Sequence, residues 1–277
     1  MGITAAQVKE LRDATNVSMM ECKKALEECD GNMEEAFKVL RERGMAVAAK
    51  RADKEANQGI IASSSSEDGK TIAMVEVNCE TDFAARNDSF KAFVDEVSQK
   101  ALETDESLNE VLADELIKKV ASIGENLKIR RNVRYQLSET GSLGSYIHMG
   151  GKVGVLIEVG CQKEASKQSP AFADLVKDLT LHIAAASPSY LQSDEIPAEV
   201  LEEERKIYAK QVEGKPENIV DKIVDGKIRK YYSDVCLVDQ PFVKEPKMSV
   251  TDLLNSVAKE LDDTLTIRRF TRYQLGA

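Results

Sequence analysis

Hydrophobic positions along the chain follow two different periods, which predicts a mixture of strands and helices. Apolar runs of strand length end at Val-Glu-Val-Asn-Cys (75–79) and at Ile-Glu-Val-Gly-Cys (157–161). After each run, apolar residues recur every three or four positions, as on one face of a helix. In the first helical segment they are Phe90, Phe93, Val94, Val97 and Ala101. In the second they are Phe172, Leu175, Val176, Leu179 and Ile183.

The same pattern therefore occurs twice, and the chain contains an internal repeat. The two strand ends, 75–79 and 157–161, are offset by 82 residues. Ile-Arg-Arg-Asn-Val-Arg-Tyr-Gln-Leu (129–137) matches Ile-Arg-Arg-Phe-Thr-Arg-Tyr-Gln-Leu (267–275) at an offset of 138, longer by 56. The second copy thus carries an insertion of about that length. Each copy predicts a strand pair, one or two helices and a final strand, so the fold class is α+β, a duplicated core of antiparallel sheets with helices on one face.

The insertion predicts two helices joined by a short turn. Pro197 suits the first turn of a helix that runs to about Val212. Gly214-Lys215-Pro216 turns the chain, and a second helix runs from Glu217 to about Val235. Their narrow apolar stripes are typical of an antiparallel coiled-coil hairpin that projects from its domain, with a tip suited to contacting a partner.

Residues 1–55 predict a module of three short helices and a linker. Thr4 with Gln7, and Asn32 with Glu35, have the spacing of capping boxes at the starts of the first and third helices. Asn16-Val17-Ser18 separates the first two helices. Gly44 predicts the end of the third helix, and residues 45–58 read as a charged linker.

The start of the second helix, residues 19–29, carries Met19, Met20 and Lys23, which we call the N-terminal face. Adjacent helical positions point about 100° apart, so Met19 and Met20 cannot both enter the same core. We expect one of them in the core. Methionine also suits adaptable binding surfaces, and the alternative is that this helix start docks on a partner.

Cys-Glu-Thr-Asp-Phe-Ala-Ala-Arg-Asn (79–87), the Phe83 turn, connects the first repeated strand to its helix. A phenylalanine is unusual there, because connections are usually polar and solvated. Phe83 either folds back under its own helix or binds a partner, with Asp82 beside it to set the direction. The second copy has Gln-Lys-Glu-Ala-Ser-Lys-Gln-Ser at this place (162–169). Since a residue needed only for folding should occur in both copies, the repeat favours a binding role.

Composition narrows the class of protein. The 277 residues carry a net charge of −10, which argues against a general nucleic-acid binder. The five cysteines form no Cys-x-x-Cys pair and there are two histidines, so the common zinc spacings are absent and a reducing compartment is expected. With no secretory signal and no apolar run long enough for a bilayer, we expect a cytoplasmic protein that does not bind membranes.

No catalytic constellation is evident in the sequence. His148 and His182 are separated by a whole strand and helix, and Gly150-Gly151-Lys152 fails as a phosphate loop because Val153 follows the lysine. We therefore expect no cofactor and no metal. An enzyme using Asp82 and Arg86 on a small substrate stays open as an alternative. The repeated Ile-Arg-Arg strands could also bind nucleic acid, but we favour arginines on a solvated face, offset by nearby acids.

Several motifs resemble one family. Thr-Asp-Phe-x-Ala-Arg-Asn after a Glu-Val-Asn-Cys strand is similar to the signature of the elongation factor Ts family. Residues 19–26 and 40–44 resemble its ubiquitin-associated-like amino-terminal module, and the insertion resembles its protruding coiled coil. The motifs come in the right order over nearly the whole chain. Ala84 departs from the valine that the family often has, and Asn16-Val17-Ser18 from its usual small residues, often glycine.

The resemblance implies four parts: residues 1–55, the three-helix module and linker; residues 56–140, the first core half; residues 141–185 with 241–277, the second core half; and residues 186–240, the coiled-coil insertion. The chain ends at Ala277 without the carboxy-terminal helical tail of some members. We therefore expect no contacts through such a tail.

The resemblance also implies a function. Members are guanine-nucleotide exchange factors in protein synthesis, which bind the GDP-bound and nucleotide-free elongation factor Tu and promote GDP release so that GTP can bind. Such a protein is not an enzyme and needs no direct contact with nucleic acid. The implied site residues are Thr81, Asp82, Phe83 and Ala84 for disturbing the partner's Mg²⁺ site, Met19, Met20 and Lys23 for docking, and His148 on the second core half. A binding adaptor working through residues 1–50 alone remains an alternative.

Overall fold

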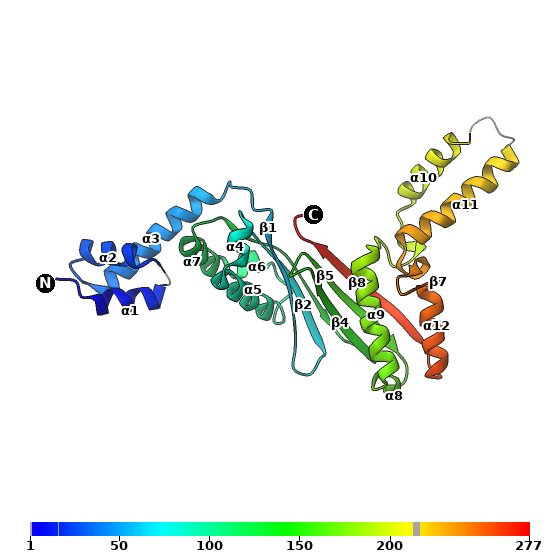
Figure 1. The fold of residues 1–277 in the computed structure, drawn as a ribbon, viewed down its shortest axis with the longest axis horizontal. Coiled ribbons are helices and arrows are strands. Elements are labelled where there is room, and N and C mark those ends of the chain that lie inside the picture. Colours follow the sequence, from blue (N-terminus) through cyan, green and yellow to red (C-terminus); the bar gives the residue numbers. More distant parts are fainter. Residues whose placement is uncertain (1, 16, 213–216) are drawn as a thin grey trace.

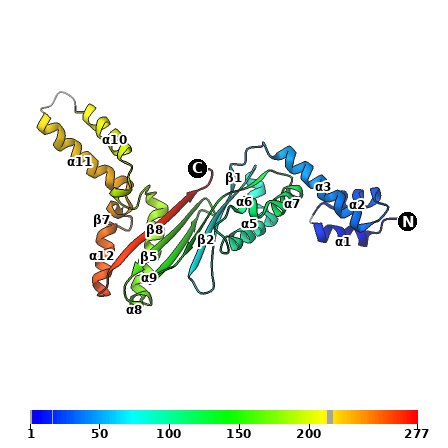
Figure 2. The same cartoon turned by 180° about the vertical axis from the view of Figure 1, so that it is seen from behind.

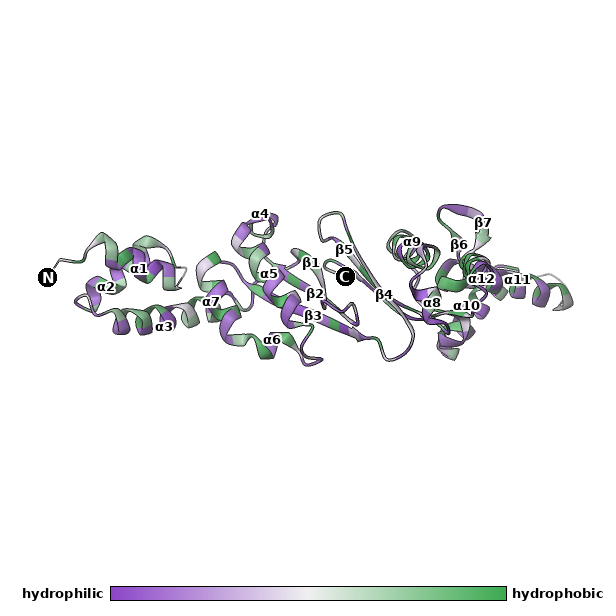
Figure 3. Ribbon diagram, turned by 90° about the horizontal axis from the view of Figure 1, so that it is seen from below, coloured by the Kyte–Doolittle hydropathy of each residue, from purple (hydrophilic) through white to green (hydrophobic). Residues whose placement is uncertain are grey.

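The computed structural model describes residues 2–15, 17–212 and 217–277. The molecule is long, with a helical module at one end, a double-sheet core in the middle and a pair of helices projecting at the other end (Figure 1). The view from behind shows the same order (Figure 2). Seen from below, the two sheets lie between two groups of helices (Figure 3).

The N-terminal module consists of α1 (Ala5–Thr15), α2 (Met19–Glu28) and α3 (Met33–Arg51). Its core is formed by Val8, Leu11, Cys22, Ala25, Leu26, Ala36 and Leu40. The reciprocal bonds of the first predicted cap are present, from Thr4 N to Gln7 Oε1 (3.0 Å) and from Gln7 N to Thr4 Oγ1 (3.3 Å). Asn32 Oδ1 accepts from the backbone N–H of Glu35 (3.3 Å) at the start of α3. Of the predicted break, Asn16 lies outside the described residues.

Gly44 does not end α3, which continues to Arg51. The glycine is buried against α7 (Ala113–Ile123), where a Cβ would lie 3.1 Å from the Cβ of Ala121. A larger residue would push the two helices apart. The sequence prediction at Gly44 was therefore wrong, because this glycine allows close packing and does not cap a helix.

Two three-stranded antiparallel sheets form the core, and each has its repeated strand in the middle. The first contains β1 (Gln58–Ser65), β2 (Thr71–Cys79) and β3 (Leu127–Gln136). The second contains β4 (Gly141–His148), β5 (Val153–Cys161) and β8 (Leu265–Gln274). The pairing register shifts after Glu76 in β2 and after Glu158 in β5. These positions are equivalent in the repeat, so the duplication extends to the irregularity of the sheet.

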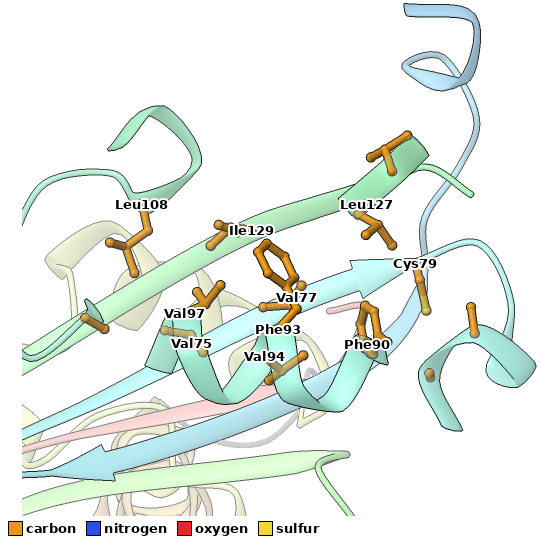
Figure 4. Packing of buried hydrophobic residues seen from close by; sticks show 14 of the residues in the cluster. Val75, Val77, Cys79, Phe90, Phe93, Val94, Val97, Leu108, Leu127 and Ile129 are labelled. Atoms are coloured by element: carbon orange, nitrogen blue, oxygen red, sulfur yellow. The ribbon is translucent and has the colours of Figure 1, made fainter. Parts of the chain in front are cut away.

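Helices cover one face of each sheet. On the first half these are the short α4 (Asp82–Arg86) and α6 (Leu108–Val111), with α5 (Asp88–Lys100) and α7. On the second they are α8 (Glu164–Lys167), α9 (Pro170–Ala186) and α12 (Val250–Glu260). Phe90, Phe93 and Val97 of α5 pack on Val77 of β2 and Ile129 of β3 (Figure 4). The predicted apolar faces of α5 and α9 are buried.

The opposite faces of the two sheets pack against each other. Their shared core contains Ile61, Ile72, Met74, Tyr135, Leu156 and Tyr273. The backbones approach closely, because a Cβ at Gly154 would lie 2.5 Å from Ile61 Cγ2. Each sheet is thus covered by helices on one side and by the other sheet on the other side.

Two of the repeated arginines join the sheets while their side chains stay partly exposed, and nearby acids offset their charges as predicted. Arg131 binds the fully buried Glu76 at 2.7 Å, and its guanidinium lies 4.1 Å from the centre of the Tyr273 ring. Arg269 binds Glu158 at 2.7 Å and lies 4.0 Å from the centre of the Tyr135 ring. The acid in each strand pair neutralises an arginine that then stacks on a tyrosine of the other half. We call each set of arginine, carboxylate and tyrosine a clasp, and the two clasps occupy equivalent positions in the repeat.

The insertion contains α10 (Ala198–Lys210) and α11 (Glu217–Val235), which lie side by side (Figure 1). Arg205 on α10 pairs with Asp225 on α11 at 3.0 Å. Pro197 immediately precedes α10, and the predicted turn Gly214-Lys215-Pro216 lies outside the described residues. The shorter elements at its base are η1 (Ser193–Glu195), η2 (Leu237–Asp239), β6 (Pro241–Phe242) and β7 (Glu245–Ser249). Within the described ranges, every helix is too short or too polar to cross a membrane.

His182 fastens the base of the insertion to α9. The ring is buried; Nε2 lies 2.9 Å from Gln240 Oε1, and Nδ1 accepts from the Val243 N–H (3.3 Å). Because Nδ1 accepts, Nε2 carries the proton and donates to Gln240. His182 thus has a structural role, joining α9 to the residues that follow the insertion.

The free energy of unfolding should decrease as the pH is lowered, because the buried His182 is held neutral in the folded protein. Burial lowers the pKa of His182 below 6.5, so protons bind the unfolded state first as the pH falls through that value. Between pH 7 and pH 5, urea unfolding should show wild type losing about 1 kcal/mol more than His182→Gln, within the limit of about 1.4 kcal/mol per pH unit for one group. Equal losses in the two proteins would contradict this assignment.

Candidate partner-binding site

The Phe83 turn folds as a one-turn helix, α4, between two caps. Thr81 Oγ1 accepts from the Ala84 N–H (3.2 Å), and Asn87 Oδ1 accepts from the Ser89 N–H (2.8 Å) at the start of α5. Ala84 faces the core and is 7% exposed, whereas Phe83 is 80% exposed. The possibility that Phe83 folds back under its own helix is therefore wrong. A large apolar side chain is held in water on a short, capped helix.

The charged residues of α4 lie on the surface. Asp82 pairs with Arg86 at 3.0 Å, and both side chains remain largely in water. They lack the desolvation that is typical of catalytic carboxylates. Burial raises the pKa of the nearby Cys79 thiol to about 12, so this cysteine stays protonated at neutral pH and is a poor nucleophile.

Glu125 holds the beginning of the Phe83 turn. Its carboxylate accepts from Thr81 N (3.0 Å) and from Thr81 Oγ1 (2.6 Å). In the second copy, Asp263 occupies the equivalent place and accepts from Gln162 N (3.2 Å) and Lys163 N (2.9 Å). Hydrogen bonds from Ser166 and backbone N–H groups lower the pKa of Asp263 to about 2. A carboxylate that anchors the turn is thus part of the scaffold in both copies.

The difference between the two turns lies in what they expose. The position of Phe83 on α4 corresponds to Ala165 on α8, which is also exposed. The backbone anchors are alike, and the first copy alone presents an aromatic ring. The structure therefore supports the interpretation that Phe83 is not needed to build the unit.

The N-terminal face is exposed as well. Met20 is 63% exposed and Met19 is 44% exposed, and Lys23 forms a surface ion pair with Glu27 at 3.6 Å. The expectation that one methionine enters the core was wrong. Cys22, Ala25 and Leu26 already supply the buried face of α2, and Met19 lies one turn ahead of Cys22 at the helix start.

His148 ends β4 on the surface. Tyr146 Oη lies 2.9 Å from His148 Nδ1, and the two rings stack with their centres 5.6 Å apart. Met149 follows in a left-handed conformation (φ 50°) and is 71% exposed. Sequence reasoning missed Met149. The available signal was a second large apolar residue in a connection, next to two glycines.

The connection from β4 to β5, which begins at His148 and which we call the His148 turn, lies at the same end of the double sheet as the Phe83 turn. Gln58 pairs with Cys79, where β2 leads into the Phe83 turn, and Lys152 Nζ donates to Gln58 Oε1 (3.5 Å). The sequence offers no signal for this proximity, which depends on how the two sheets pack. The N-terminal face is separate from both, at the far end of α3 (Figure 1).

Phe83, Met20 and Met149 keep large apolar side chains exposed on well-packed elements. Among the described residues, no group of three His, Cys, Asp or Glu side chains is arranged to hold a metal ion. The site offers exposed apolar and aromatic side chains at the Phe83 turn, on the N-terminal face and beside His148.

Comparison with known proteins places the chain in a family. The pattern of the family described as Elongation factor TS matches residues 80–277. Over the whole chain, the sequence is 43% identical to elongation factor Ts of Trichlorobacter lovleyi, covering 93% of that protein, and 45% identical to that of Nitratiruptor sp., covering 94%. It is 38% identical to that of Nitratidesulfovibrio vulgaris, covering 96%. The chain belongs to the elongation factor Ts family, and is therefore a translation elongation factor.

Proposed function

We propose that this protein is a guanine-nucleotide exchange factor for elongation factor Tu. The observation that carries the proposal is Phe83, an aromatic side chain 80% exposed on a capped helix, present in one copy of the repeat and replaced by Ala165 in the other. The function is binding, not bond chemistry, and takes place in the cytoplasm. It requires no cofactor and no nucleic acid.

Exchange would follow from preferential binding to one state of the partner. A GTPase holds GDP through a phosphate loop and a Mg²⁺ ion. A factor that binds best when this grip is broken must weaken GDP binding, and GDP weakens binding of the factor by the same ratio. Phe83 would insert between helices of the nucleotide domain. Asp82 would engage groups that support the Mg²⁺ site, and Thr81 and Ala84 shape the helix that carries both.

Three further regions would complete the contact. Met19, Met20 and Lys23 would dock on the nucleotide domain, where methionines can adapt to the partner's surface. His148, with Tyr146 stacked against it, would contact a different domain of the partner. The pair α10 and α11 would form a coiled-coil arm that contacts the partner. The N-terminal module would have a ubiquitin-associated-like fold.

The direct test measures release of fluorescent GDP from elongation factor Tu in stopped flow. Wild-type protein should accelerate release and weaken GDP binding by roughly 5–150-fold or more, the usual size of such coupling. The two proteins should copurify without nucleotide and separate when GDP and Mg²⁺ are added. An unchanged release rate at saturating protein would overturn the proposed function.

A further inference from the structure

The end of α3 is fastened to the base of the Phe83 turn by Arg51, Glu80 and Asn126, which we call the lock. Arg51 Nη1 donates to both carboxylate oxygens of Glu80 (3.2 and 3.0 Å). The Asn126 N–H donates to Glu80 Oε1 (2.6 Å). Asn126 Nδ2 donates to the carbonyls of Ala52 (3.3 Å) and Lys54 (2.7 Å), and the residue is only 4% exposed. A buried amide with several partners fixes the local geometry strongly.

The same helix is held a second time, nearer its middle. Gly44 allows α3 to lie directly on α7, and Arg41 pairs with Asp114 of α7 at 3.6 Å. Two attachments along one helix restrain both its position and its direction. The N-terminal module is thereby held against the first core half, although only residues 52–57 connect α3 to β1 in the chain.

The repeat shows that the lock is not required to fold a core half. Gln162 stands at the position equivalent to Glu80, and Thr264 at the position equivalent to Asn126. Other bonds of the turn are duplicated: Cys79 Sγ donates to Thr81 O (3.1 Å), and Cys161 Sγ donates to Lys163 O (3.5 Å). The lock residues therefore belong to the half that carries both Phe83 and the N-terminal module.

We propose that Glu80 and Asn126 are positioning residues, which hold the N-terminal face and Phe83 at one fixed separation so that both meet the partner together. This inference rests on the proposed function. When two contact regions are rigidly linked, binding of the first brings the second to its site at high effective concentration. Without the lock, only the contact of α3 with α7 holds the module, so residues 52–57 are released and the module can pivot on α7. Ordering it again on binding would weaken the affinity.

The first test measures geometry in the full chain without any partner. Spin labels at Lys9→Cys and Lys91→Cys, in a Cys29→Ser background, report the distance between the module and the core. Asn126→Ala should broaden the distance distribution about twofold or more, because residues 52–57 are then flexible and α3 can pivot on its remaining contact with α7. Thr264→Ala, the matched control in the second copy, should leave it narrow. A narrow distribution in Asn126→Ala would overturn the proposal.

Glu80→Gln provides a second variant that keeps the side-chain shape and removes the charge that binds Arg51. It should broaden the same distribution while thermal unfolding stays cooperative, which separates release of the module from loss of the fold. Because this readout needs no partner, its failure is distinguishable from failure of the proposed function, which is judged by GDP release with the wild-type protein.

The second test asks whether the lock couples the two contact regions. With the lock intact, Met20→Ala should weaken binding to elongation factor Tu about tenfold, because the N-terminal face then acts at high effective concentration. In the Asn126→Ala background, the same substitution should cost no more than about twofold. Equal losses in the two backgrounds would show that the module contributes independently of the lock, and would overturn the proposal.

Discussion

Replacing Phe83 by alanine should slow catalysed GDP release from elongation factor Tu by about thirtyfold or more, the effect of losing an aromatic anchor worth at least about 2 kcal/mol at an interface. The substitution should leave the free energy of unfolding almost unchanged. Phe83 is 80% exposed, and surface substitutions away from packed features usually change stability by about 0.5 kcal/mol or less. Stopped-flow GDP release and urea unfolding of the same preparation separate the two effects.

Val243→Ala is a suitable control for this experiment. Val243 is 42% exposed and lies between β6 and β7, on the half of the core that does not carry Phe83. Its substitution should leave GDP release unchanged and so measure the effect of removing any exposed apolar side chain. If GDP release from elongation factor Tu is as fast with Phe83→Ala as with Val243→Ala, the role given to Phe83 in the proposed function is wrong.

Replacing Arg131 by methionine should destabilise the protein by about 3–5 kcal/mol, because it removes the close partner of a buried charge. Glu76 is fully buried, and the remaining cation, Arg130, lies 3.9 Å from it. The substitution also removes the guanidinium that stacks on Tyr273 and donates to the Gln274 carbonyl (3.0 Å). Denaturant unfolding monitored by circular dichroism gives the difference directly.

Arg269→Met is the matched comparison, since it makes the same change in the other half. Here Glu158 keeps Arg268 at 3.0 Å, so a close ion pair survives. The expected loss is about 1–3 kcal/mol, closer to that of one charge-assisted hydrogen bond. Equal losses in the two variants would show that the second arginine does not compensate in the way these distances indicate.

The repeat and the buried helix faces could be predicted from the sequence because they depend on local periodicity. The residues that pack α5 and α9 onto their sheets recur at helical spacing, and the strand ends recur at a constant offset. The exposure of Phe83 could also be predicted, because the equivalent Ala165 shows what the scaffold itself requires. In each case the information lies within one element or in its duplicate.

Features that depend on contacts between distant elements were missed. Gly44 has the local signal of a helix end, but its role is close packing against Ala121 of α7, which lies more than seventy residues later in the chain. The contacts of Arg131 and Arg269 with the other sheet were missed because alternation alone does not show which face meets another sheet. A signal was present in Glu76 and Glu158, each an acid inside an otherwise apolar repeated strand, because a buried carboxylate requires a partner.

The two reciprocal clasps, Arg131 on Tyr273 and Arg269 on Tyr135, make the contact between the core halves isologous. Such an interface is the kind that two identical subunits form around a twofold axis. The core is thus organised as a homodimer fused into one polypeptide. Fusion frees each half from the requirement to be identical, so that one half can carry Phe83 and the other the insertion, whereas a true dimer would display every such feature twice.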